Sequence, residues 1–454
     1  MSIIVIIPGL VSLFLVSRRR IETAFLSVFL PCLLLLPSQY AFRIPHLPPL
    51  SAAEYALIPL GVVGLSRFLR RRSVAPMDIL VILFAASVGL SEVLHEPILN
   101  NGIFFAVGAF VSMVLAYMVG RQLIEPDLRF ATVRRFVSLV LLVGIPNLYE
   151  WRMGQSLYGI FGIKVLGIPI RVQYRNGRAR VGSVFGGGED AGIVFAMTFC
   201  LNAWLVSLRR IKASVSLGKT LTTLEKYHVP GLLLLLYVWL TESRGPLIAL
   251  AAGYLILQVY RSKRTKLMTA VAAVLLASGY MATSTYFQSY THVSTYVAET
   301  NPEVSSALYR REMNRVYAPI AEAGGWTGWS VSRIPRIHGM KSIDNQYLLV
   351  HLANGRLGYI FLLLIVLENI RILLVRLWKF KALQDRLFVA SMLAAMAVLW
   401  LTLLTVYMGA QLPTISFLLM GWIQSTVPSK AAKHSGALVS GFRSQPSSTQ
   451  QVFS

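Results

Sequence analysis

Charged residues are scarce in this 454-residue sequence, where 14% of the residues are Asp, Glu, Lys or Arg and 55% are hydrophobic. A soluble domain has roughly one quarter charged residues, so water is excluded as the main solvent of this chain. Cysteine is scarce as well. Cys32 and Cys200 both lie within apolar runs, where a thiol packs as a small hydrophobe, and no disulfide is expected.

Several familiar signatures are missing. The sequence has no phosphate loop (GxxxxGK followed by Ser or Thr), no GxSxG elbow, no HExxH and no CxxC, so an ATP-driven pump or a zinc protease has no visible machinery. It also lacks the inverted pair of Gly/Pro-broken helices that is typical of transporters. The apolar run 3–16 precedes Arg18 to Arg20, the reverse of a signal peptide, and is predicted to be the first membrane helix.

What the sequence does have is a series of long apolar runs, such as 103–119, 267–283 and 347–367. Runs of this length cross a hydrocarbon core, and they must be helical because lipid offers no partners to the backbone. The sequence therefore predicts an all-α polytopic membrane protein with about 12–13 transmembrane helices in a single membrane domain, residues 1–427. The predicted helices span 3–16, 23–37, 55–66, 79–94, 103–120, 136–149, 190–208, 230–243, 245–260, 267–283, 346–370, 387–407 and 412–427.

The placement of the basic residues predicts the orientation. A net charge of +24 would suggest a nucleic-acid partner in a soluble protein. Here Lys and Arg gather in alternate short links, the positive-inside pattern of a bacterial inner (cytoplasmic) membrane protein, and no nucleic acid is expected. The links are Arg18 to Arg20, Arg67 with Arg70 to Arg72, Arg121 to Arg135, Arg209 to Lys226, Arg261 to Lys266, and Arg371 to Arg386. They are predicted to be cytoplasmic, together with a disordered C-terminal tail, 428–454.

This orientation leaves two outer loops, at about 150–189 and 284–345. The first carries six cations where short outer loops avoid them: Arg152, Lys164, Arg171, Arg175, Arg178 and Arg180. Some of them would meet lipid phosphates, or they would bind an anionic substrate, since the guanidinium fork grips phosphate oxygens in two places. Glycines 186–188, Glu189 and Asp190 follow at the mouth of the next helix.

Arg244 lies at the outer edge of the predicted hydrocarbon, within Thr241-Glu242-Ser243-Arg244-Gly245. A charge at that depth costs several kcal/mol unless it is paired or faces water, which makes Arg244 a candidate functional residue. The alternative is a structural pair with Glu242 or a side chain that snorkels to the interface.

The second outer loop is predicted to be partly helical, because Tyr309, Met313, Val316 and Ile320 recur at helical spacing. Its other side, including Arg310, would be a solvated face or part of a site. Trp326 and Trp329 would stack on sugars or anchor at the membrane interface. The loop closes with Arg336, His338, Asp344 and Asn345, a group in which a histidine or a carboxylate could accept a proton.

Three stretches in this order resemble the superfamily of O-antigen ligases and Wzy-type polysaccharide polymerases. They are Arg180 to Phe185, Thr241 to Gly245, and Asp344-Asn345-Gln-Tyr347-Leu with Gly355 and Gly358 in the following helix, and the likeness covers roughly 135–425. The resemblance implies a membrane fold like that of the C-type glycosyltransferases. It also implies transfer of a glycan from undecaprenyl pyrophosphate at the periplasmic face, with no metal and no cofactor, beside other polysaccharide-assembly proteins.

By the same resemblance, Arg180 and Arg244 hold the pyrophosphate. From the charged and polar residues of the outer loops, Arg178, Glu189, Arg310, Arg336 and Asn345 are predicted to complete the substrate-binding set. The ligase branch usually begins its third motif with a histidine, whereas this chain has Asp344, a form more like polymerases of repeat units. Asp344 or His338 is therefore expected to be the base. The alternatives are a ligase that transfers finished glycan to a lipid or protein, a lipid-linked glycan flippase, and an inactive scaffold.

Overall fold

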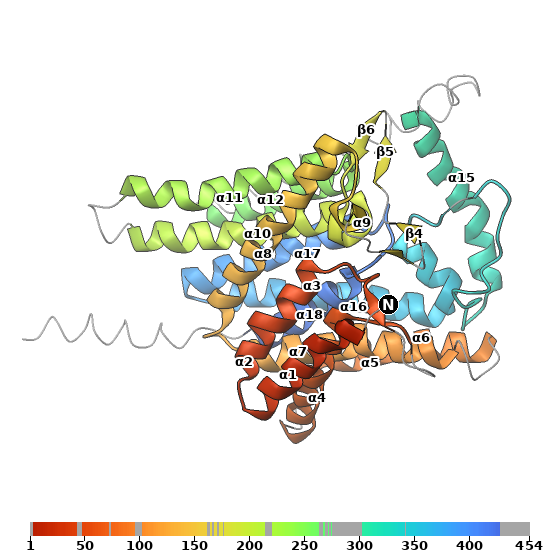
Figure 1. The fold of residues 1–454 in the computed structure, drawn as a ribbon, viewed down its shortest axis with the longest axis horizontal. Coiled ribbons are helices and arrows are strands. Elements are labelled where there is room, and N and C mark those ends of the chain that lie inside the picture. The colour runs from red at the N-terminus through yellow and green to blue at the C-terminus, as the bar shows by residue number, and fades with distance from the viewer. Residues whose placement is uncertain are drawn as a thin grey trace, which may run out of the picture.

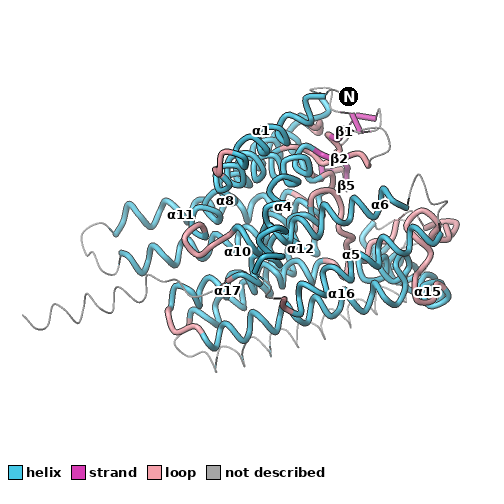
Figure 2. The backbone as a smooth tube through the Cα atoms, turned by 90° about the horizontal axis from the view of Figure 1, so that it is seen from below, coloured by secondary structure: helices cyan, strands magenta, loops and turns pink. Residues whose placement is uncertain are grey.

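The computed structural model describes residues 3–42, 48–71, 74–95, 102–160, 164–165, 168–169, 172–175, 177–213, 220–262, 267, 271, 274, 302–340 and 342–426. These residues are mostly helical, and the helices lie roughly side by side along the long axis of the molecule (Figures 1 and 2). Six of the described helical stretches are long and apolar enough to cross a membrane. At this level the prediction of an all-α polytopic membrane protein is confirmed.

In the N-terminal third, a 3-10 turn at Ile3–Ile6 leads into α1, and two helices carry a π-helical segment. The helices are α1 Ile7–Ser17, α2 Ile21–Thr23, η2 Ala24–Phe29, α3 Leu30–Leu35, α4 Ala52–Arg71, α5 Pro76–His95, α6 Gly102–Ala109, η3 Phe110–Leu115, α7 Ala116–Leu123 and α8 Arg129–Met153. The remainder comprises α9 Leu157–Ile160, η4 Ser183–Phe185, α10 Gly188–Ala213, α11 Thr220–Leu240, α12 Arg244–Arg261, α15 Pro302–Ala323, α16 Gln346–Lys379, α17 Leu383–Thr402 and α18 Leu412–Ser425.

Three short antiparallel pairs of strands interrupt the helices: β1 Ala41–Phe42 with β2 Leu50–Ser51, β3 Lys164–Val165 with β4 Ile168–Pro169, and β5 Gln173–Arg175 with β6 Arg178–Arg180. None of them was predicted. They are too short for an alternating pattern to mark them in the sequence.

Helices overlap every other predicted segment, and of 267–283 only Leu267, Val271 and Val274 are described, all three as helix. The predicted tail 428–454 lies outside the described residues. The helix predicted from the spacing of Tyr309, Met313, Val316 and Ile320 is confirmed as α15. The segment 136–149 was predicted too short, because α8 begins at Arg129, whose buried guanidinium pairs with Asp385 of α17 at 2.8 Å. Hydropathy alone excludes a charged residue such as Arg129 from a membrane helix. The ion pair with Asp385 allows Arg129 to be buried within it.

Among the six apolar spans, α10 and α17 are the most buried. In α10 and α17, 83% of the apolar window is buried inside the protein, against 44% to 50% in α4, α5, α6–α7 and α8. α10 packs against α8, α11, α12 and α17. The first turn of this well-packed helix lines the candidate site.

α7 and α18 cross at two glycines. A Cβ added to Gly120 would lie 2.0 Å from the carbonyl oxygen of Leu418, and one added to Gly421 would lie 2.0 Å from that of Tyr117. Small residues allow helix backbones in a membrane to approach this closely.

We predict that Gly421→Ala separates these helices and destabilises the protein by roughly 1–3 kcal/mol, the usual cost of overpacking. The measurement is thermal unfolding of the purified protein in detergent. Gly108→Ala is the matched control, because a Cβ at Gly108 meets nothing within 4 Å. Equal melting temperatures for the two variants would contradict the prediction.

Candidate functional site

A cavity of about 370 Å³ lies at the start of α10. It brings together the β5–β6 hairpin, the glycine loop, the segment before α16 and the connection between α17 and α18. The hairpin and α15 lie toward the same end of the helices (Figure 1). The lining residues are Gln39, Gln173, Arg180, Phe185, Gly186, Gly187, Gly188, Glu189, Asp190, Ser342, Asp344, Val406, Tyr407, Gly409 and Ala410.

Arg180 connects three segments. Arg180 is the last residue of β6. Its Nη2 donates to Glu189 Oε1 at 2.7 Å and to Ser243 Oγ at 3.0 Å. Its Nε donates to the carbonyl oxygen of Thr241 at 3.4 Å. The first two stretches singled out in the sequence, around Arg180 and around Thr241 to Gly245, are therefore in direct contact.

Glycine is required where these segments meet. A Cβ on Gly188 would lie 2.8 Å from both Arg180 Cγ and the Thr241 oxygen. Gly186 adopts a φ of +77°, a conformation that L side chains rarely adopt. The glycine run thus allows Arg180 to lie against the beginning of α10.

Asp190 ties α10 to the α17–α18 connection. The backbone N–H of Gly409 donates to its carboxylate, and a Cβ on Gly409 would lie 2.5 Å from Asp190 Oδ2. Gln411 strengthens the junction, because its Nε2 donates to the carbonyl oxygens of Leu36 at 2.8 Å and Val184 at 3.1 Å.

Asp344 enters the cavity from a segment that α15 holds. Tyr309 Oη donates to the Ser342 oxygen at 2.6 Å and accepts from the Ser342 N–H at 2.8 Å. The Asp344 N–H points to Met313 Sδ at 3.3 Å. Helix α15 therefore sets the position of the carboxylate.

Burial raises the pKa of Asp344 above its usual range. A hydrogen bond from Ser342 acts in the opposite direction, the negative charge of Glu189 raises the pKa further, and Arg310 and Arg180 lower it. Burial and the carboxylates of Asp190, Asp344 and Glu189 also raise the pKa of Tyr407. The cavity is thus a place where a carboxyl group holds a proton more readily than in water.

Arginines surround the acidic lining. Arg310 of α15 lies 3.9 Å from Glu189 Oε1, and Arg178 lies 3.6 Å from Glu242 Oε1. Arg244 is the exposed first residue of α12 and directly follows Ser243, the partner of Arg180. Arg180 lines the cavity itself, and Arg178, Arg244 and Arg310 belong to the hairpin, α12 and α15, which carry its partners or neighbours.

The structure brings some of the predicted site residues together and separates others. Arg180, Glu189 and Asp344 line one cavity, with Arg310 beside Glu189. Arg336 and His338 are exposed in the segment before α16 and are not among the residues that line this cavity. Asn345 caps α16, since its Oδ1 accepts from the N–H groups of Tyr347 at 3.0 Å and Leu348 at 3.2 Å.

Tyr407 and Gly409 were missed. The sequence predicted a helix over 387–407, whereas α17 ends at Thr402 and the chain turns into the cavity wall. The only signal was the sequence Met408-Gly409-Ala410 shortly before Pro413, a weak mark of a turn.

No protein-family model matches this chain, and no curated protein matches it either. The resemblance therefore rests on the three sequence stretches alone. Within the described part of the chain, no group of three or more His, Cys, Asp or Glu side chains is arranged to hold a metal ion.

Removing the Arg180 guanidinium is predicted to loosen the hairpin. Arg180→Gln leaves Glu189 without its closest cation, and losing a charged hydrogen bond of this kind costs about 1.5–3 kcal/mol. We expect faster amide hydrogen exchange over residues 173–187. Arg178→Gln is the matched control, because its side chain is 64% exposed and such pairs contribute little. Equal exchange in both variants would refute the role given to Arg180.

Proposed function

We propose that this chain is a membrane glycosyltransferase that polymerises oligosaccharide repeat units carried on undecaprenyl pyrophosphate, at the periplasmic face of a bacterial inner membrane. The observation that carries the proposal is the convergence of Arg180, Glu189 and Asp344 on one cavity. Asp344 lies far from Arg180 and Glu189 in the sequence, and Arg180 also contacts the second stretch through Ser243.

The donor is already activated, so the protein has to bind a diphosphate, orient an acceptor and accept a proton. Asp344 takes the proton from an acceptor hydroxyl, and the hydroxyl oxygen attacks the anomeric carbon at the reducing end of the donor glycan. The bond from that carbon to the diphosphate breaks, and its electron pair leaves with the lipid diphosphate.

The charges of the site suit this division of roles. Glu189, Asp190 and Asp344 give the cavity wall three carboxyl groups beside one arginine, Arg180. Carboxylates accept hydrogen bonds from sugar hydroxyls, which makes the interior a place for glycan. The sequence assigned the diphosphate to Arg180 and Arg244, but Arg180 is bonded to Glu189 and Ser243. The diphosphate is therefore assigned to Arg178, Arg244 and Arg310, whose guanidinium groups would stabilise the charge that grows on the leaving group.

The proposed topology has about 12–13 transmembrane helices, with the C-terminus in the cytoplasm and an architecture like that of the C-type glycosyltransferases. It is supported by the six apolar spans and by the basic links at alternate helix ends. On this topology the cavity faces the periplasm.

The decisive assay uses the protein reconstituted in liposomes with an undecaprenyl-pyrophosphate oligosaccharide. A ladder of products supports a polymerase, and a single transfer to another acceptor indicates a ligase. Movement of the lipid-linked glycan across the bilayer without new bonds indicates a flippase.

In this assay we predict that Asp344→Asn lowers the polymerisation rate by roughly 10²–10⁴-fold, the contribution of a positioned general base. Asp127→Asn is the matched control, because Asp127 is exposed in the link between α7 and α8. Undiminished polymer length and yield in both Asp344→Ala and His338→Ala would overturn the assignment of the base.

The raised pKa of Asp344 predicts how the polymerisation rate depends on pH. A carboxylate acts as a base only when deprotonated, so the rate falls as the pH falls through that raised pKa and is constant above it. Arg310→Gln removes a cation that lowers this pKa, so the acidic limb should move to higher pH. Rate–pH profiles of both proteins test this, and an unmoved or oppositely moved limb would contradict it.

A further inference from the structure

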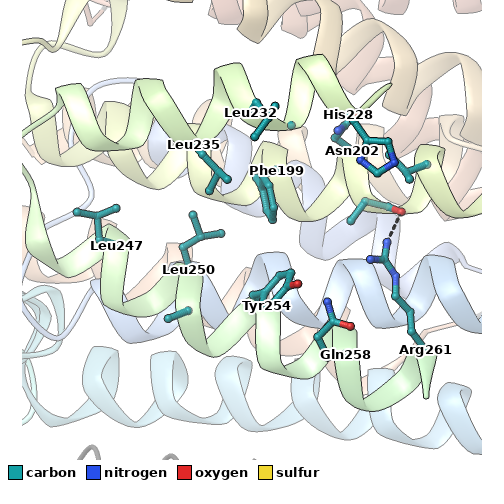
Figure 3. A pocket seen from close by; sticks show the side chains of 14 residues that line it. Phe199, Asn202, His228, Leu232, Leu235, Leu247, Leu250, Tyr254, Gln258 and Arg261 are labelled. Atoms are coloured by element: carbon teal, nitrogen blue, oxygen red, sulfur yellow. Dashed lines mark hydrogen bonds between the residues drawn. The ribbon is translucent and has the colours of Figure 1, made fainter. Parts of the chain in front are cut away.

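A second cavity, of about 740 Å³, lies between α10, α11 and α12 and is separate from the site at the start of α10. Leu232 and Leu235 of α11 and Leu247 and Leu250 of α12 line its apolar part (Figure 3). Asn202, His228, Gln258 and Arg261 gather at the other end (Figure 3). The cavity is thus amphipathic along its length.

The cavity exists because α11 and α12 both pack on α10 but touch each other little. Gly231 brings α11 close to α10, with a Cβ position 3.5 Å from Asn202 Nδ2. On its other side α12 lies close to α10 at Gly253, whose Cβ position is 3.3 Å from Cys200 Sγ. The space left between α11 and α12 is the cavity, and Leu232 and Tyr254 are among its lining residues. The side chain of Leu232 is 66% exposed and that of Tyr254 is 47% exposed.

The cationic end has a fixed geometry. Arg261 Nη2 donates to the carbonyl oxygen of Ala203 at 2.7 Å and to Ser207 Oγ at 2.9 Å, so the guanidinium reaches across from α12 to α10. His228 projects toward the same end from α11 (Figure 3). In the sequence Lys263, Arg264 and Lys266 lie within the next five residues after Arg261. A negatively charged group is therefore favoured at this end.

The dimensions match one leaflet of a bilayer. Leu247 and Arg261 lie fourteen residues apart on one helix, about 21 Å along its axis. That is more than half of a hydrocarbon core of roughly 30 Å, so an acyl chain whose headgroup lies at Arg261 has apolar lining over the whole depth of its leaflet.

We propose that this cavity binds an anionic phospholipid, with its phosphate at Arg261 and His228 and an acyl chain between α11 and α12. On the proposed topology this lipid belongs to the cytoplasmic leaflet, on the side away from the glycosyl-transfer site. The amphipathic lining and the charge at one end favour it over a polyprenyl chain, whose diphosphate would lie at the other end of α12.

The test is native mass spectrometry of the full-length protein in a mild detergent, titrated with phosphatidylglycerol or phosphatidylcholine of identical acyl chains. We expect one phosphatidylglycerol bound at least tenfold more tightly than phosphatidylcholine. Arg261→Gln and His228→Gln should each remove most of that preference. Arg20→Gln, which removes an exposed arginine from the link after α1, should leave it unchanged.

The apolar part is tested by Ala251→Phe, which fills the cavity without altering its charge and should weaken both lipids. Equal affinity for the two phospholipids, or a preference that survives both Arg261→Gln and His228→Gln, would overturn the proposal. Undecaprenyl phosphate is the third ligand. If the protein binds undecaprenyl phosphate more tightly than phosphatidylglycerol, and Ala251→Phe weakens that binding, the occupant is the polyprenyl chain and the proposal is wrong. No outcome depends on glycosyl transfer.

Discussion

The hydrogen bonds of Arg180 hold the candidate site together. One guanidinium binds the first turn of α10 through Glu189 and the α11–α12 turn through Ser243, while its backbone belongs to the β5–β6 hairpin. A cation only 15% exposed requires such partners, because water reaches it poorly. The requirement also explains the glycine at position 188, since any Cβ there would push Arg180 away from α10.

The bilayer explains why this cluster lies at a helix end. Lipid offers no hydrogen-bond partners, so polar side chains are tolerated at the ends of helices or in the protein interior. α10 and α17 are the most buried spans, and the chain beside their ends can therefore carry several charges that other charges satisfy. Glu189 and Asp190 open α10, and Tyr407 and Gly409 follow α17, which places the candidate site at the ends of the two most buried spans.

Hydropathy made the helices predictable, because each apolar run must form its own backbone hydrogen bonds. Sequence also selected Arg180, Glu189 and Asp344, since charges are conspicuous at predicted helix ends. It could not reveal that Arg180 pairs with Glu189, nor that α17 ends at Thr402, because the residues after it stay apolar. The end of α17 is stabilised by tertiary contacts instead, where the N–H of Gln346 meets the carbonyl oxygens of Leu403 at 3.0 Å and Val406 at 3.1 Å.

The arginines at the two ends of α12 have different neighbours and different proposed roles. This helix begins at Arg244 and ends at Arg261, about 26 Å apart at 1.5 Å per residue, close to the thickness of a hydrocarbon core. Arg244 adjoins the acidic cavity through Ser243, and Arg261 closes the apolar cavity against α10. On the proposed topology each arginine lies at the phosphate level of one leaflet. The same residue type would then neutralise a reacting diphosphate on one side and hold a resident lipid on the other, so Arg→Gln changes at the two ends of α12 should affect two different ligands independently.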